Sequence, residues 1–197
     1  MLVFRGKQPM VGGMDLLSLC RRFLFHAPVA DREATCASAD PGDADAQFGL
    51  GLKYGSASGS AQDLVAAAQW FRKAADQNHY LAQFNLGMML AQGQGMPRDD
   101  MAALIWFRKA AEGGDGGAQY ILGMRYHRSS VDALQMDATE SRIEAYKWFC
   151  VSAAQGYKGS QAAGERVSLA MSREEVAEGN RRAAMFVARP VGSAQDQ

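Results

Sequence analysis

The sequence lacks the features that mark disulfide-stapled, membrane-spanning and nucleic-acid-binding proteins. Its three cysteines, Cys20, Cys36 and Cys150, are odd in number and show no Cys-x-x-Cys spacing, which disfavours a disulfide framework or a zinc site. No run comes near the roughly 18 apolar residues that a transmembrane helix needs, so membrane insertion is not expected. Lysine plus arginine number 21, as do aspartate plus glutamate, and this balance gives no reason to expect a nucleic-acid partner.

The sequence also lacks the common catalytic motifs. It contains no His-Glu-x-x-His, no phosphate-binding P-loop and no Gly-x-Ser-x-Gly nucleophile elbow. The segment 127–141 carries residues able to bind a metal, but their spacing matches no metal-binding template, and we interpret it as a solvated loop. These residues are His127, Asp132, Asp137 and Glu140. We therefore expect no catalytic residue, no metal and no cofactor.

What the sequence does contain is an internal repeat with a period of 36 residues. The dipeptide Ala-Gln stands at 46–47, 82–83 and 118–119, and Trp-Phe stands at 70–71, 106–107 and 148–149, the last after six additional residues. Aligning residues 46–81 with 82–117 gives 15 identities without a gap. Such a period is typical of a helical solenoid, because one unit cannot bury its apolar face until it stacks on the next.

The first helix of the central unit is predicted from a periodic apolar face. Its members are Ala82, Leu86, Met89 and Leu90, and the Gly/Pro turn 93–97 follows. Gly87 stands inside this helix and recurs as Gly51 and Gly123, although a mid-helix glycine costs roughly 1 kcal/mol relative to alanine. We therefore expect a close approach between helix axes there, helped by the alanine pairs 74–75 and 110–111.

The second helix of the central unit is predicted between Asp99, its expected N-cap, and the glycines Gly113 and Gly114. Asp63 is expected to cap the corresponding helix one unit earlier. Residues at helical spacing form its apolar face: Ala103, Trp106, Phe107, Ala110 and Ala111.

The combined pattern A-x-x-x-L-G-x-x-Y, a Gly-rich turn with a downstream Asp, and A-x-x-W-F-x-x-A-A resembles the Sel1-like repeat, a relative of the tetratricopeptide repeat. The resemblance covers about 46–157 and continues weakly to about 187. The departures are Leu90 for Tyr, Asn78 for the closing Gly, and Ser129 and Val131 for turn glycines. The resemblance implies an all-α fold, an α-solenoid of stacked antiparallel helix pairs with about three repeats plus a degenerate capping helix pair.

These observations predict three regions. Residues 1–44 form an N-terminal segment, partly disordered, with a possible short amphipathic helix at 15–25. Residues 45–187 form the repeat domain, with units at about 45–80, 81–116 and 117–157 and a cap at 158–187. The cap ends in a helix that a capping box at Ser172 and Glu175 opens and that runs to about Val187. Residues 188–197 form a disordered tail.

A cytoplasmic location is expected, with export to the periplasm as the alternative. Arg21 and Arg22, followed by Phe23, suggest a twin-arginine export motif. The apolar run that follows is broken by His26 and Pro28 and is too short for a signal peptide.

Two functional hypotheses follow from the resemblance. The first is a non-enzymatic adaptor in bacterial signalling or assembly that binds a protein or peptide segment on its concave helical face. The alternative is a protein that binds or hydrolyses peptidoglycan fragments or β-lactams, as some cysteine-rich bacterial members are reported to do. Family members with disulfides place paired cysteines inside the repeats, whereas here only Cys150 lies in one, so the adaptor is the preferred hypothesis.

A candidate binding stripe follows from the helical wheel of the first helices. Leu52, Met88 and Met124 occupy one position in the three units and are expected to project away from the packed side. Residues at two further positions of the repeat flank this stripe: Asn85 with Ile121, and Gln92 with Arg128. The alternative is that the three apolar residues fill the seams between adjacent first helices.

Two smaller interpretations concern single positions. The basic pairs 72–73 and 108–109 are interpreted as a solvated helix face whose side-chain stems cover apolar neighbours, with a weak anion site as the alternative. Cys150 is expected to pack as a small buried apolar residue.

The repeat predicts where stability is concentrated. Trp106→Ala should come close to unfolding the chain, because truncating a buried large aromatic costs roughly 3–5 kcal/mol and a whole domain is stable by only about 5–15 kcal/mol. Trp148→Ala should cost less, since its unit has an irregular turn and a degenerate neighbour. Urea unfolding of the alanine variants of Trp70, Trp106 and Trp148 tests this order. If Trp106→Ala were the mildest of the three, the stacked array would be contradicted.

Overall fold

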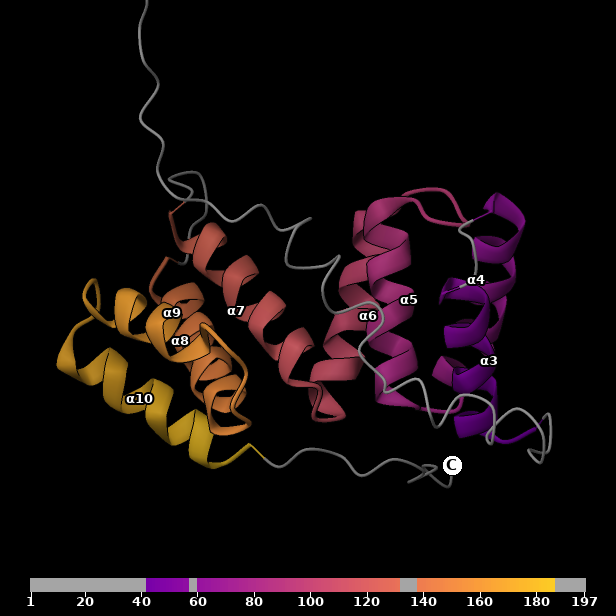
Figure 1. Cartoon of the computed structure of the whole chain (residues 1–197). Coiled ribbons are helices and arrows are strands. Elements are labelled where there is room, and N and C mark those ends of the chain that lie inside the picture. Colours follow the sequence, from indigo (N-terminus) through magenta and orange to yellow (C-terminus); the bar gives the residue numbers. More distant parts are fainter. Residues whose placement is uncertain (1–41, 57–59, 132–137, 187–197) are drawn as a thin grey trace, which may run out of the picture.

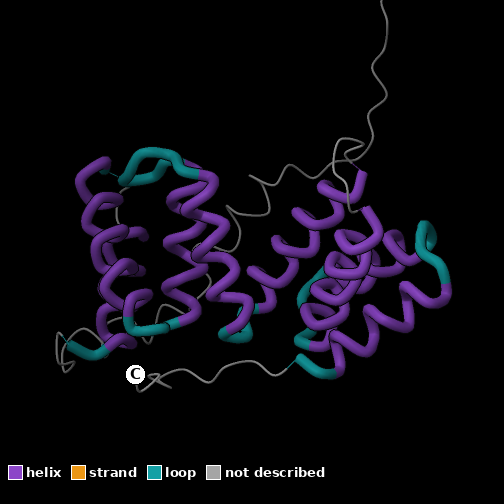
Figure 2. Tube along the Cα trace, turned by 180° about the vertical axis from the view of Figure 1, so that it is seen from behind, coloured by secondary structure: helices purple, strands orange, loops and turns teal. Residues whose placement is uncertain are grey.

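The computed structural model describes residues 42–56, 60–131 and 138–186. Within these ranges the chain forms eight helices and no strand: α3 (Ala44–Ser56), α4 (Ala61–Asp76), α5 (Tyr80–Gln92), α6 (Asp100–Glu112), α7 (Gly116–Val131), α8 (Ala138–Ala154), α9 (Ser160–Ser168) and α10 (Arg173–Ala184). They stand in a row, from α3 at one end to α9 and α10 at the other (Figures 1 and 2). The predicted helix at 15–25 and the C-terminal tail lie outside the described ranges.

The helices form three pairs that stack along the row, which confirms the predicted all-α solenoid. Each first helix packs on the second helix of its own unit, as in α3 on α4, α5 on α6 and α7 on α8. Units meet where α4 packs on α5 and α6 on α7. One apolar core runs through the first two units without interruption, so neither buries its face alone. In Figure 1, α7 is tilted relative to α5 and α6.

The predicted N-caps are correct for one second helix and wrong for the other. Asp99 caps α6, accepting hydrogen bonds from the backbone N–H groups of Met101 and Ala102. In α4 the cap is Ser60, whose hydroxyl accepts from the N–H of Asp63 at 3.1 Å. Ser60 stands one 36-residue period before Met96, which has no side-chain oxygen to cap a helix. Because Ser60 can cap a helix, α4 begins three repeat positions earlier than α6 does.

A glycine–phenylalanine contact holds the two helices of each pair together. A β-carbon placed on Gly87 would lie 2.8 Å from the ring of Phe107 in α6. A β-carbon on Gly51 would lie 2.5 Å from the ring of Phe71, and a β-carbon on Gly123 would lie 2.7 Å from the ring of Phe149. The close approach predicted from the recurring glycine is therefore present, although a ring makes it rather than the alanine pairs. The ring lies where any other side chain would stand.

The alanine pairs and the recurring glutamines serve the junctions between units. Ala74 and Ala75 of α4, and their counterparts in α6, are fully buried in the clusters that contain the next first helix. The side-chain amide of Gln83 donates to the carbonyl of Ala75 at 3.1 Å, and Gln119 repeats this bond to Ala111. Each bond adds a side-chain donor to a carbonyl in the last turn of a second helix, which also accepts from the backbone N–H group three residues on. Ala-Gln is therefore the sequence mark of a unit junction.

The C-terminal cap differs from the predicted helix pair. Both α9 and α10 pack on α8, and they do not stack on each other as the other pairs do. Ion pairs attach α10 to α8, since Arg182 bonds to Glu140 and Glu144 and Arg142 bonds to Glu175. The capping box at the start of α10 is present as predicted, but the helix ends at Ala184 rather than near Val187. Beyond that end, Phe186 meets Trp148 edge-on at 5.3 Å between ring centroids.

The glycine–phenylalanine contact makes a prediction that opposes helix propensity. Gly87→Ala should destabilise the protein by about 1–3 kcal/mol, because overpacking outweighs the gain of roughly 1 kcal/mol in propensity. Gly164→Ala is the matched control, since its new methyl would have its nearest described neighbour at 3.4 Å, an ordinary contact. In a Phe107→Ala background, Gly87→Ala should become neutral or stabilising, and urea unfolding measures all three. Equal effects of Gly87→Ala in both backgrounds would show that the ring is not the obstacle.

Candidate binding surface

The structure buries much of the predicted binding stripe. Met88 is 2% exposed and Leu52 is 8% exposed, and both belong to the continuous core of the first two units. Asn85 is buried as well, and its amide donates to the carbonyl of Leu81 in the same helix at 2.7 Å. The expectation that these three side chains lie on an open surface is therefore wrong. Leu52 and Met88 pack in the core instead.

The burial follows from the position of α5 in the array. This helix belongs to the central unit and packs on α4 and on α6. None of its residues, from Tyr80 to Gln92, is exposed, and Gln92 is half-buried. The helical wheel predicts an exposed face because it assumes that one side of the helix meets solvent, but no residue of α5 is exposed.

The remaining part of the stripe lies on α7. Met124 is 37% exposed, Arg128 is exposed and Ile121 is half-buried. The next first helix, α9, has only nine residues and packs on α8. A face of α7 is therefore left accessible, and we call Met124, Arg125 and Arg128 the α7 surface.

The α7 surface is positively charged. Arg125 and Arg128 are exposed, and α7 contains no acidic residue, while α5 contains no charged residue at all. Arg125 does lie near Asp100, whose pKa is lowered mainly by its hydrogen bond to Arg98 and in small part by Arg125. An apolar methionine beside two guanidinium groups can contact both apolar and acidic side chains of a partner.

Polar contacts near both ends fix the position of α7. The carboxylate of Asp115 accepts from the N–H of Ala118 at 2.6 Å and so caps the start of the helix. Near the other end, Arg108 of α6 donates to the hydroxyl of Tyr126 at 2.9 Å. Burial raises the pKa of Asp115 to about 6, although its hydrogen bonds with backbone N–H groups oppose the shift. The cap therefore places a titratable group inside the junction between α6 and α7.

His79 has the same place in the preceding unit, and the sequence motifs gave no role to it. Its Nδ1 accepts from the N–H of Ala82 at 3.1 Å, and its Nε2 lies 3.0 Å from the carboxylate of Asp45. Burial lowers the pKa of His79, against the opposing effect of Asp45. The available signal was that His79 stands 36 residues before Asp115, another residue whose side chain can cap a helix.

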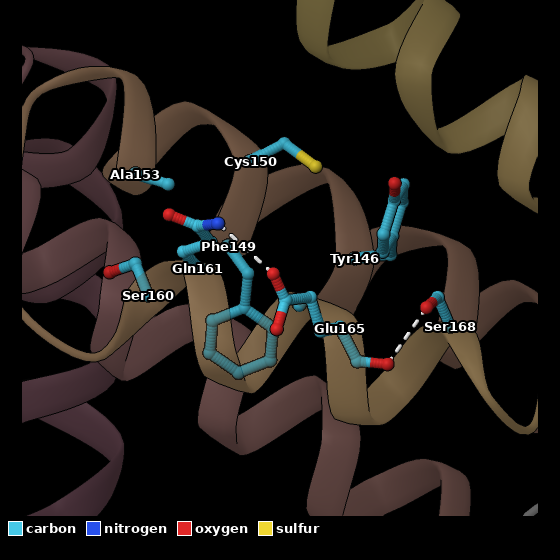
Figure 3. Close-up of a pocket in the computed structure, with 9 residues that line it drawn as sticks. Tyr146, Phe149, Cys150, Ala153, Ser160, Gln161, Glu165 and Ser168 are labelled. Carbon is cyan, nitrogen blue, oxygen red and sulfur yellow. Dashed lines mark hydrogen bonds between the residues drawn. The ribbon is translucent and has the colours of Figure 1, made fainter.

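A small pocket lies between α8 and α9 (Figure 3). Its volume is about 160 Å³, below the roughly 300–1,000 Å³ of ordinary ligand pockets. Cys150 lines it and is half-buried, rather than buried as predicted. Burial raises the pKa of this thiol, so the reactive thiolate is scarce near neutral pH. The pocket therefore does not have the properties of a cysteine-based catalytic site.

Three of the four cations in the basic pairs lie over tryptophan rings, in agreement with the preferred interpretation of these pairs. The ammonium of Lys73 lies 4.0 Å from the ring centroid of Trp70, and that of Lys109 lies 4.4 Å from the ring centroid of Trp106. Arg72 reaches from α4 to the ring of Trp106 in α6, at 5.5 Å. These cations thus contribute to packing along the second helices.

The described part of the chain contains neither a cluster of metal-binding side chains nor a membrane-spanning helix. No three or more His, Cys, Asp or Glu side chains in those ranges are grouped as a metal ion would require. Nor is any described helix both long and apolar enough to cross a membrane.

Comparisons with known proteins agree with this architecture. A family model described as Sel1 repeat matches residues 44–79, 81–115 and 117–157. The crystal structure of c5321, a protective antigen of uropathogenic Escherichia coli strains displaying an SLR fold, is similar with a TM-score of 0.65 and 29% identity, over 81% of this chain and 33% of that one. A Sel1 repeat protein from Oxalobacter formigenes is similar with a TM-score of 0.56 and 28% identity, over 79% of this chain and 61% of that one. The chain thus spans about one third and three fifths of these two proteins, and no curated protein matches it.

The buried cap of α7 predicts a pH dependence of stability. Because the pKa of Asp115 is about 6 when folded and 3.8 in the reference state, the unfolded chain releases this proton first as the pH rises. Ionisation of this carboxyl group should therefore lower the free energy of unfolding as the pH rises from about 4 to about 6. Above pH 6 the loss should be complete and amount to about 3 kcal/mol. Asp115→Asn keeps a capping oxygen but cannot ionise, so this variant isolates the effect of the charge.

Urea unfolding of the native protein and of Asp115→Asn at several pH values tests this prediction. The variant should match the native protein near pH 3.5 and become more stable than it above pH 6. A variant that is less stable above pH 6 would show that the ionised carboxylate stabilises the helix more than its burial costs.

Proposed function

The chain belongs to the Sel1 repeat family, whose members commonly act as protein-interaction scaffolds, and on that basis we propose that it binds a segment of another protein through the face formed by its first helices. The protein acts as a non-enzymatic adaptor in bacterial signalling or assembly. The contact site is the α7 surface, with the half-buried Ile121 one turn earlier on the same helix.

One observation carries the proposal. The glycine–phenylalanine contacts and the buried caps hold α7 in place, while its outward side exposes Met124 together with Arg125 and Arg128. Exposed apolar groups edged by charge on a rigid support are suited to a protein partner. The raised pKa of the half-buried Cys150 disfavours a thiolate nucleophile at this thiol.

The double variant Met124→Glu, Arg128→Glu tests the site. Affinity capture from the native host followed by mass spectrometry should lose the partners that the native chain retains, while the thermal melt stays nearly unchanged because both side chains are exposed. Leu169→Glu, at an 87% exposed position after α9, is the matched control and should keep the partners. Unchanged capture by the double variant would refute the α7 surface as the site.

Met88→Glu serves as a contrasting variant. It places a charge at a position that is 2% exposed, so it should lower the melting temperature markedly. A normal melt for this variant would mean that the face of α5 is open to solvent after all.

A further inference from the structure

The outer face of α3 is less buried than the same face of the later first helices. Leu86 of α5 and Leu122 of α7 are 0% and 1% exposed, whereas Leu50, at the same position of the repeat, is half-buried. One turn further along, Tyr54 is 36% exposed and Leu90 only 6%. In α3 both positions are therefore partly exposed, whereas in α5 both are buried, and in α7 Leu122 is buried while Tyr126, the counterpart of Tyr54, is half-buried.

The reason is that the later first helices are covered by the preceding unit. Leu86 shares a core cluster with Ala74 and Ala75 of α4, and Leu122 shares one with the corresponding alanines of α6. No described helix precedes α3. A solenoid needs a terminal element that covers this last apolar face, because an open end invites association with other chains.

A segment ahead of α3 has the residue pattern of such an element. Five positions of α4 are buried: Ala67, Ala68, Phe71, Ala74 and Ala75. Counting back 51 residues from each gives Leu16, Leu17, Cys20, Phe23 and Leu24, which are all apolar. The same offset of 51 residues aligns the exposed pair Arg72 and Lys73 with Arg21 and Arg22. The segment 15–25 therefore has the residue pattern of a second helix.

We propose that residues 15–25 dock on the face of α3 that includes Leu50 and Tyr54 and close this end of the array. Phe23 and Leu24 take the positions of an alanine pair and supply the apolar surface that covers Leu50. The proposal does not depend on the function proposed above.

The chain length permits this docking. Residues 26–43 provide 18 residues between the segment and α3, which can span up to roughly 60 Å. The 13-residue α3 is only about 20 Å long, so the segment can run beside it in the antiparallel sense of the other junctions. The tether also raises the effective concentration of the segment to about millimolar, which favours it over a second copy of the chain.

Cross-linking through the native Cys20 tests the docking directly. Tyr54→Cys is introduced into the full chain with Cys36→Ser and Cys150→Ser, and a short bis-maleimide is added. The expected product is an intramolecular link between residues 20 and 54, mapped by mass spectrometry of peptides. The matched control carries Leu169→Cys at the far end of the array, where no link to Cys20 should form. Equal yields from both chains, or links only between copies, would refute the proposal.

Amide hydrogen exchange of α3 gives an independent test. Leu24→Asp places a charge at a position expected to face Leu50, and it should speed exchange in α3 by about tenfold or more. Ser18→Asp is the matched control, because residue 18 corresponds to the exposed Gln69 of α4, and it should leave exchange unchanged. If the two variants behave alike, residues 15–25 do not cover α3.

Discussion

The contact between a mid-helix glycine and a phenylalanine ring is the constraint on which the array depends. It occurs once in each unit, at Gly51, Gly87 and Gly123, and each time the ring takes the space that a side chain would need. The contact sets how closely the helices of a pair approach. Phe71 and Phe149 are almost completely buried as a result, so each pair forms a compact block with one apolar side left for its neighbour.

Stacking such blocks requires a second set of contacts at the junctions. Alanine pairs allow α4 and α6 to lie close to the next first helix, and the amides of Gln83 and Gln119 donate to carbonyls at the ends of the second helices. Each junction also buries a capping residue that can titrate, His79 in one and Asp115 in the next. Their pKa shifts have opposite effects on stability: burial of neutral His79 destabilises the fold as the pH falls below about 6.5, and Asp115 destabilises it as the pH rises toward 6. At the C-terminal end of the described array, ion pairs of Arg182 with Glu140 and Glu144 attach α10 to α8.

The same packing limits where a partner can bind. The central first helix, α5, has no exposed residue, so a continuous groove across all three first helices is not available on the described surface. The α7 surface, formed by Met124, Arg125 and Arg128, lies on the first helix of the irregular third unit. The core that stabilises the array and the candidate binding surface therefore lie on different parts of the chain.

Local spacing and the chemistry of single residues were enough to predict the repeat, the helix pairs, the glycine close approach and the capping of α6 and α10. They were not enough to predict which residues remain exposed. Leu52, Met88 and Met124 occupy one position of the repeat, yet the first two are buried and the third is 37% exposed. A helical wheel describes one helix, whereas burial depends on every helix packed around it. The packing of whole helices is therefore what assigns the candidate surface to α7, and what sets both α9 and α10 on α8 instead of forming a fourth pair.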